Sequence, residues 1–300
     1  MRLSAAIATF NEEKNIIRCL KSVYNWVDEI VIVDGNSTDK TVEIIKRLDK
    51  HHKTKFFIEE NPPMFHANKQ KAIERCTGDW ILQLDADEVV SEELKNEIRT
   101  AAVLETSPSG TAAVNVAFWL PRLNFFLGQP LKKGGQYPDY TLRLYRNGVA
   151  KFPCKNVHEQ VTVDPTVTLN SFQDLKKMPK QVRHDNITME QSNNEAIGYL
   201  KAPLLHYPYP TFSEYLNKWN RYTSLEAENL KKQGFKPSFF NFIKYFCILP
   251  KYWFFKTYLR HLGFLDCFPG FVFSLFSAIR FWGIYVNLLK KYTNKDAAAA

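Results

Sequence analysis

Cysteine is scarce and scattered in this chain of 300 residues. The five cysteines lie far apart, and no two of them form a CxxC pair. A disulfide-stabilised secreted domain and a structural zinc site both require cysteines at characteristic spacings, so we expect neither. The pattern predicts reduced thiols in a cytosolic protein.

Long apolar runs are also missing. No stretch reaches roughly 18 uninterrupted apolar residues, the length expected of a spanning helix, and the best run, 267–279, ends at Arg280. The first apolar segment turns charged at Glu12, which makes it too short for the core of a signal peptide. From the sequence we therefore expect neither a spanning helix nor an export signal.

Acidic residues are rare in the last third of the chain. Residues 201–300 contain 14 Lys and Arg against 5 Asp and Glu, which accounts for the whole net charge of +9. The same segment holds 26 of the 43 aromatic residues. The neutral first 200 residues and the basic, aromatic last 100 residues predict two regions with different roles.

The front of the chain alternates between strand and helix patterns. Apolar strands are predicted at 3–9, 29–34, 55–60 and 80–85. Helices are predicted at 11–25 and 66–76, and two more are expected to end at residue 48 and to begin at residue 91. Further strands are predicted at 112–120 and 140–146, separated by a long loop. This order predicts an α/β fold with a mostly parallel sheet and helices on both faces. Ligands of such sheets bind at the carboxyl ends of strands, where Thr9, Asp34 and Asp85 should converge.

The fourth strand ends in crowded carboxylates, in the sequence "WILQLDADEVV". Residues two apart in an extended segment point to the same side, so Asp85 and Asp87 can face one crevice. A divalent cation such as Mg²⁺ or Mn²⁺ prefers oxygen ligands and would relieve the repulsion between them. The alternative is a solvated strand end without a ligand.

Several motifs follow one another in a characteristic order. They are "AAIATFNEEKNIIRCLKSV", "DEIVIVDGNSTDKTVEI", "CTGDWILQLDADE", "PRLNFFLG", "GGQYPDYTLRLYR", "VHE", "LLHYPYPTFSEYLNKWNRYT" and "GFLDCFPGFVF". In this order they resemble the inverting family 2 glycosyltransferases, which have the glycosyltransferase-A (GT-A) fold. The second half is similar to the bacterial branch that builds lipopolysaccharide core, including its β-glucosyltransferases. The resemblance covers nearly the whole chain except 170–200.

The resemblance implies a nucleotide-sugar site and a metal, Mn²⁺ or Mg²⁺. The residues it assigns to the nucleotide and donor are Thr9, Phe10, Asn11, Glu12, Asp34, Lys69, Asp85 and Arg143. It implies that Asp87 binds the metal directly and that Asp85 contacts the ribose or the metal's water. His158, in "VHE", could complete the metal shell or contact phosphate, and the guanidinium groups of Arg143 and Arg146 could pair with phosphate. We interpret His206 as structural.

Asp139, in "GGQYPDY", is the expected general base. An inverting transfer needs one carboxylate to accept the proton of the acceptor hydroxyl as that oxygen attacks the anomeric carbon. The position matches the place where the resembled family carries its base. A turn residue after a proline is the alternative.

The predicted domains are a catalytic domain over 1–210 and a helical region over 211–296. Within the first, 170–200 is expected to be a surface insertion, and the four alanines at 297–300 a cloning remnant outside the fold. The helical region alternates Lys and Arg with aromatic residues, which is typical of helices that lie in a membrane interface. The resemblance adds a lipid-linked or glycan acceptor at the inner face of the cytoplasmic membrane. A helical cap packed on the catalytic domain is the alternative.

Three other functions are alternatives for this chain. A sugar-phosphate nucleotidyltransferase usually has a glycine-rich loop after its first strand, and "ATFNEEKN" has no glycine. A basic, aromatic tail can bind single-stranded nucleic acid, but the acidic strand ends would then have no role, so no nucleic-acid partner is expected. A catalytically inactive scaffold of the same family is the third. The leading prediction is a metal-dependent inverting transferase that uses a UDP-hexose in cell-envelope polysaccharide synthesis.

Overall fold

The computed structural model describes residues 2–49, 52–62, 66–104, 115–154, 161–163 and 197–296. The chain divides into two compact units, of which the first comprises Met1–Arg122 and Asp139–His206 and the second Leu123–Pro138 and Tyr207–Ala300. The second unit therefore begins near the predicted boundary at 210, and it also takes in 123–138. Most of the predicted insertion at 170–200, and the alanines at 297–300, lie outside the described residues.

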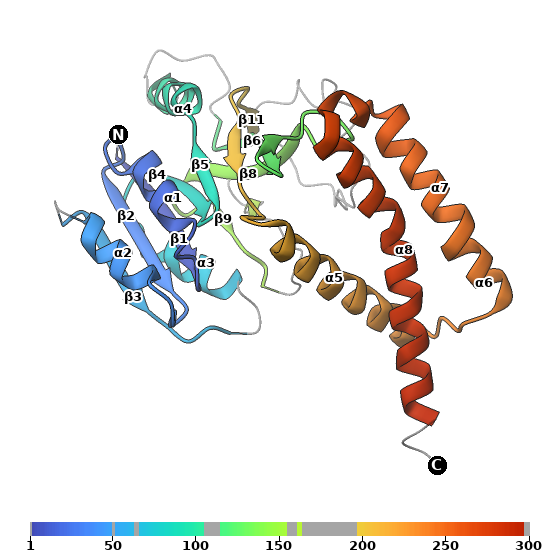
Figure 1. Ribbon diagram of the computed structural model, residues 1–300. Coiled ribbons are helices and arrows are strands. Elements are labelled where there is room, and N and C mark those ends of the chain that lie inside the picture. Colours follow the sequence, from blue (N-terminus) through green and yellow to red (C-terminus); the bar gives the residue numbers. More distant parts are fainter. Residues whose placement is uncertain are drawn as a thin grey trace. The chain divides into compact units, whose positions relative to one another are not determined.

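The first unit is built around one sheet (Figure 1). Its strands are β1 (Leu3–Thr9), β2 (Glu29–Asp34), β3 (Thr54–Ile58), β4 (Trp80–Asp85), β5 (Glu88–Val90), β6 (Ala117–Phe126), β8 (Asp139–Arg146), β11 (Ile197–Tyr199) and β12 (Leu204–His206). The order is β3-β2-β1-β4-β8-β6-β12-β5, with β11 beside β6. Neighbours from β3 to β4 run parallel, whereas β4–β8, β6–β8 and β5–β12 are antiparallel. The α/β class with a largely parallel sheet is confirmed.

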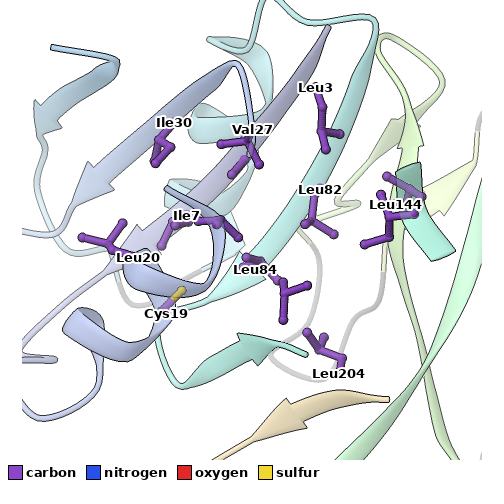
Figure 2. Close-up of a cluster of buried hydrophobic side chains, with 14 of the residues drawn as sticks. Leu3, Ile7, Cys19, Leu20, Val27, Ile30, Leu82, Leu84, Leu144 and Leu204 are labelled. Atoms are coloured by element: carbon purple, nitrogen blue, oxygen red, sulfur yellow. The ribbon is translucent and has the colours of Figure 1, made fainter. Parts of the chain in front are cut away.

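Two hydrophobic clusters cover the two faces of this sheet. Alternate residues of β1 point to opposite faces, so Leu3 and Ile7 join one cluster and Ala6 the other. Helices α1 (Ile16–Val23), α2 (Thr41–Leu48) and α4 (Glu92–Leu104) supply side chains to the first cluster, and α3 (His66–Glu74) to the second. Figure 2 shows Leu82 and Leu84 of β4 in the first cluster, together with Leu20 of α1.

Two predicted elements differ in extent from the observed ones. The helix expected over 11–25 begins only at Ile16, because Asn11 has a left-handed backbone (φ 55°) and belongs to a loop. The strand expected over 112–120 is β6, which continues through Phe126. The longer strand brings Arg122 opposite Asp139 on β8.

A buried carboxylate joins the elements at the end of the sheet opposite the expected site. Glu29 accepts hydrogen bonds from Ser4 Oγ (2.5 Å) and the Thr77 backbone N–H (2.8 Å), and it pairs with Lys55 Nζ at 2.5 Å. Burial alone would raise its pKa, but these donors outweigh burial and lower the pKa of Glu29 to about 2. One side chain thus ties β1, β2, β3 and the turn before β4 together.

Replacing Glu29 with Gln should lower the free energy of unfolding by about 3 kcal/mol near neutral pH, which follows from a pKa lowered from 4.5 to about 2. The folded protein binds this proton less readily than the unfolded chain. The stabilisation is therefore present above pH 4.5 and is lost as the pH falls toward 2. Urea unfolding across this range should show the two proteins converging in acid, and a pH-independent difference would contradict the assignment. Glu93→Gln, at an exposed position on α4, should behave like the wild type throughout.

The second unit is mostly helical. Its elements are β7 (Gln129–Pro130), α5 (Phe212–Lys232), α6 (Phe239–Ile243), η3 (Lys244–Ile248), α7 (Leu249–Phe254), η4 (Phe255–Arg260), η5 (Gly263–Asp266) and α8 (Cys267–Asp296). β7 pairs with Phe125 and Phe126. One core cluster joins Ala227 of α5, Tyr245 of η3 and Leu288 of α8.

One helix in the described residues is long and apolar enough to cross a membrane, judged by length and composition alone. It spans Gly263–Thr293, with a mean hydropathy of 1.5 over its best window, of which 33% is buried. The helix passes on average hydropathy, although it contains no uninterrupted apolar run of the length expected of a spanning helix. Arg280 interrupts the apolar run, but a single charge leaves the average hydropathy of a long helix high.

Candidate active site

The loops that follow β1 and β2 are held together by the carboxylate at the end of β2. Thr9 and Asp34 are direct neighbours in the parallel register. The Thr9 hydroxyl donates to Asp34 Oδ1 at 2.8 Å, and Ser37 donates to the same carboxylate from its backbone N–H (2.7 Å) and its hydroxyl (2.6 Å). Asp34 is fully buried. Its carboxylate thus fixes the shape of the strand ends where the nucleotide is expected.

The residues after Thr9 form a second connection between these loops. The Asn11 side-chain oxygen accepts from the Thr38 backbone N–H at 2.8 Å, and the Glu12 backbone N–H donates to Thr41 Oγ1 at 2.8 Å. Phe10 remains 43% exposed at the strand end. An exposed aromatic ring on a loop fixed on both sides can stack against a planar base.

Asp85, at the end of β4, lies between two cations from distant parts of the chain. Its Oδ2 accepts from Arg143 Nη2 at 2.6 Å, and its Oδ1 pairs with the ammonium of Lys69 on α3. Arg143 also donates to the Gln83 side chain. The sheet pairs β4 with β8, and this pairing places Arg143 beside the strand end.

Glu88 extends this cluster toward the expected base. It is fully buried and accepts from Arg143 Nη2 at 2.8 Å, while Arg122 Nη1 lies 3.6 Å away. Arg122 in turn donates to Asp139 Oδ2 from Nε (2.9 Å) and Nη2 (2.6 Å). Carboxylates and guanidinium groups therefore alternate from Asp85 to Asp139. We call the row Asp85, Arg143, Glu88, Arg122 and Asp139 the ion-pair row.

The charges in the ion-pair row stabilise one another. Burial would raise the pKa of Asp85, but Arg143 and Lys69 outweigh it and hold that pKa well below its usual range. Burial would likewise lower the pKa of Arg143, yet Asp85 and Glu88 raise it. Removing either sign would leave a buried charge without its counter-charge.

Asp87 lies beside a histidine from the other end of the first unit. His206 Nε2 is 3.3 Å from Asp87 Oδ2, and both side chains are largely buried. The contact arises because β12 pairs with β5 in an antiparallel register that sets His206 opposite Glu88. Sequence reasoning missed this partner, although a polar residue ends the short apolar strand "LLH" just as Asp85 ends β4.

The Asp87–His206 pair fits part of a divalent-metal site. Two ligands at adjacent corners of an octahedron with bonds of about 2.1 Å are about 3 Å apart, close to the observed separation. Carboxylate oxygen and imidazole nitrogen are both ligands of Mn²⁺. The described part of the chain contains no group of three or more His, Cys, Asp or Glu placed to hold an ion. The remaining ligands would be substrate phosphates, water or a residue outside the described ranges, and Mg²⁺ sites commonly use phosphates and water.

The other predicted residues fall into three groups. Asp139 lies opposite Arg122, a residue for which the sequence offered no functional signal. Arg146, the second guanidinium expected to pair with phosphate, lies over the Trp80 ring at the beginning of β4, away from Asp85. His158 lies outside the described residues.

Comparison with known proteins gives the family. The model for Glycosyl transferase family 2 matches residues 4–106. A glycosyltransferase of Rickettsia felis is 30% identical over 279 residues, which cover 92% of this chain and 86% of that protein. The lipopolysaccharide core biosynthesis glycosyltransferase LpsC of Rhizobium meliloti is 26% identical over 308 residues, which cover 99% of this chain and 97% of that protein.

Solved structures that are similar to this chain include TarS residues 1–349 of S. aureus in complex with UDP-GlcNAc, with 16% identity, a TM-score of 0.46 and coverage of 93% of this chain and 90% of that one. The mannosyltransferase PcManGT of Pyrobaculum calidifontis, in complex with GDP-Man and Mn²⁺, has 14% identity and a TM-score of 0.47. The match covers 100% of this chain and 81% of that one. The family match and the relatives that span most of the chain agree on one assignment: this protein is a member of glycosyl transferase family 2.

Proposed function

We propose that the protein transfers a hexose from a UDP-sugar to an acceptor hydroxyl, with inversion and with the help of Mn²⁺ or Mg²⁺. The observation that carries the proposal is the Asp87–His206 pair, 3.3 Å apart, next to a strand end where Asp85 is already held by cations. Of the two aspartates, Asp87 is therefore the one placed to bind an ion. Asp85 positions Lys69 and Arg143 around the donor.

The donor lies across the ends of β1, β2 and β4. Phe10 stacks on the base, while Asp34 and Thr9, together with Asn11 and Glu12, define the base and ribose pocket. Lys69 contacts the diphosphate, and its pairing with Asp85 keeps its ammonium at the strand end. Asp87 and His206 hold the metal, which supplies positive charge to the departing diphosphate when bound. His158 remains a proposed further ligand.

Asp139 is the proposed general base. Its carboxylate accepts the proton of the acceptor hydroxyl as the hydroxyl oxygen bonds to the anomeric carbon and the bond from that carbon to the diphosphate breaks. Two N–H groups of Arg122 donate to Asp139 Oδ2, which fixes the direction of the carboxylate. A carboxylate held in one orientation meets the hydroxyl in the geometry needed for attack.

The proposed acceptor is a hydroxyl of a glycan or lipid-linked glycan in the synthesis of cell-envelope polysaccharide. The likeness to LpsC along nearly its whole length supports this class. An acceptor of this kind would meet the enzyme at the inner face of the cytoplasmic membrane. A thermal-shift series with UDP-glucose, UDP-galactose, UDP-N-acetylglucosamine and GDP-mannose, with and without Mn²⁺, would identify the donor, because a ligand stabilises the native state in proportion to its affinity.

Replacing Asp87 with Ala should reduce turnover of the donor at least about a hundredfold, since the substitution removes a ligand of the charge that stabilises the leaving diphosphate. His206→Gln should raise the Mn²⁺ concentration required for half-maximal activity. Donor hydrolysis and transfer, measured over a Mn²⁺ titration, check both variants. Glu43→Ala, at an exposed position on α2, is the matched control and should retain normal activity.

The same experiment separates the alternatives. Unchanged activity in Asp87→Ala would refute the proposed metal site. Release of pyrophosphate from a nucleoside triphosphate and a sugar phosphate would identify a nucleotidyltransferase. An inactive scaffold would show neither donor turnover nor a Mn²⁺-dependent thermal shift with any nucleotide sugar.

A further inference from the structure

Large apolar side chains are exposed along one continuous helical run in the second unit. α6, η3, α7 and η4 follow one another without a break from Phe239 to Arg260. Exposed residues recur every three or four positions, which places them on one side of a helix. They are Phe240, Lys244, Ile248, Tyr252, Phe255 and Leu259. Phe240 is 82% exposed and Phe255 64%. Large apolar side chains gathered on one exposed side of a helix are typical of an interaction site.

The charges on this surface have one sign. Residues 235–265 contain five Lys and Arg and no Asp or Glu. Lys244, Lys251 and Arg260 are exposed among the aromatic residues. The next acidic residue, Asp266, accepts hydrogen bonds from the backbone N–H groups of Lys132 (3.2 Å) and Lys133 (2.7 Å), so its charge is used within the unit.

The exposed apolar surface continues past the end of η4. Leu265 is 54% exposed and Phe268, in the first turn of α8, is 68% exposed. We call the exposed side chains of residues 239–268 the aromatic–basic face. Phenyl rings beside lysines match a boundary where acyl chains meet anionic headgroups.

We propose that the aromatic–basic face docks on an anionic lipid bilayer and enters only its interfacial layer. This inference goes beyond the proposed reaction and does not depend on it. The face would anchor the enzyme by burying phenyl rings among the outer acyl segments, while its cations contact lipid phosphates. A neutral bilayer lacks the second attraction and should bind more weakly.

The packing of α8 favours this shallow mode over a spanning one. α5 lies along α8: Trp219 Nε1 donates to Phe276 O at 3.2 Å, and Asn287 Nδ2 donates to Thr223 Oγ1 at 3.3 Å. The two helices meet so closely that a Cβ at Gly283 would lie 2.7 Å from Trp219. The opposite surface of α5 exposes charged residues, namely Lys218, Arg221 and Lys232. If α8 crossed the bilayer, these charges would have to enter the hydrocarbon with it, at a high free-energy cost.

Vesicle flotation with the full chain tests the proposal, using phosphatidylcholine vesicles with and without phosphatidylglycerol. The protein should float with the anionic vesicles at low salt and much less with neutral ones. Lys244→Gln/Lys251→Gln/Arg260→Gln should weaken binding about a hundredfold, since each cation near the surface contributes roughly fivefold. Phe240→Ser/Phe255→Ser/Phe268→Ser should weaken it at least about tenfold.

Matched controls lie in the first unit. Lys21→Gln/Lys46→Gln/Arg47→Gln removes the same charge from exposed positions of α1 and α2, and Ile58→Ser removes an exposed apolar side chain. Both should bind vesicles as the wild type does. Equal weakening by the charge control would show that net charge alone drives binding and would overturn the proposal.

Two further outcomes would also overturn it. If the wild type stays unbound to anionic vesicles and light scattering shows a dimer that the triple Phe variant abolishes, the face contacts a second copy of the chain. If alkaline carbonate leaves the protein on membranes and only detergent releases it, α8 spans the bilayer. Release by carbonate supports shallow docking. Circular dichroism of each variant verifies that its helices remain formed.

Discussion

Replacing Asp139 with Asn is expected to lower kcat about a thousandfold, within the range that general bases contribute. The amide keeps the size of the side chain and can still accept from Arg122, but it cannot take the proton of the acceptor hydroxyl. The KM for the donor and the Mn²⁺-dependent thermal shift with UDP should therefore stay near the wild-type values. Steady-state kinetics with donor and acceptor varied separately measure kcat and the KM for each substrate, and so show whether only kcat falls.

The Asp139→Glu variant tests whether the loss of kcat is caused by the loss of proton transfer. It restores a carboxylate one methylene away and should recover part of the lost kcat, which a merely structural contact to Arg122 would not predict. Glu93→Gln, the same chemical change at an exposed site on α4, should leave the kinetics unaltered. A normal kcat in Asp139→Asn would show that another group accepts the proton.

Replacing Arg143 with Met is expected to lower the free energy of unfolding by about 3 to 5 kcal/mol near neutral pH. Met approximates the length of the side chain without its charge, so Glu88 loses the guanidinium at 2.8 Å and Asp85 the one at 2.6 Å. Glu88 is fully buried and cannot compensate with water. Chemical denaturation of both proteins across a range of pH measures the difference.

The sign of the pH dependence follows from the pKa of Asp85. In the wild type that pKa is lowered, so the ionised carboxylate stabilises the fold above its ordinary value of 3.8, and this stabilisation fades as pH falls through the folded value. Without Arg143 the Asp85 carboxylate binds a proton more readily in the folded state, so protonation at low pH reduces the destabilisation of the variant. The difference should shrink in acid, and a difference that grows would contradict the ion-pair row. Arg99→Met, at an exposed position on α4, should show no such effect.

The convergence of the strand ends could be predicted because it depends on local patterns. Mainly apolar strands of six or seven residues, each ending in a polar residue, place Thr9, Asp34 and Asp85 at one edge of a parallel sheet. The register then makes Thr9 and Asp34 neighbours, as their equal positions at the two strand ends require. The order of the motifs likewise pointed to the family.

The partners of these residues could not be predicted in the same way. Arg122 and Glu88 are ordinary charged residues in sequence, and only the antiparallel pairing of β6 with β8 brings Arg122 to Asp139. His206 is far from Asp87 along the chain and reaches it through the pairing of β12 with β5. Such contacts depend on strand order in the sheet, which periodicity does not encode.

The sequence by itself determined the alternating α/β front, the carboxylate-rich strand end, the family and the basic, aromatic character of the last hundred residues. Only the tertiary structure decided which charges neutralise one another, that His206 accompanies Asp87, and that α8 packs along α5. The physical reason is range: propensity and periodicity act between residues a few positions apart. Ion pairs and helix contacts form wherever the folded chain brings side chains within a few ångströms, whatever their separation in sequence.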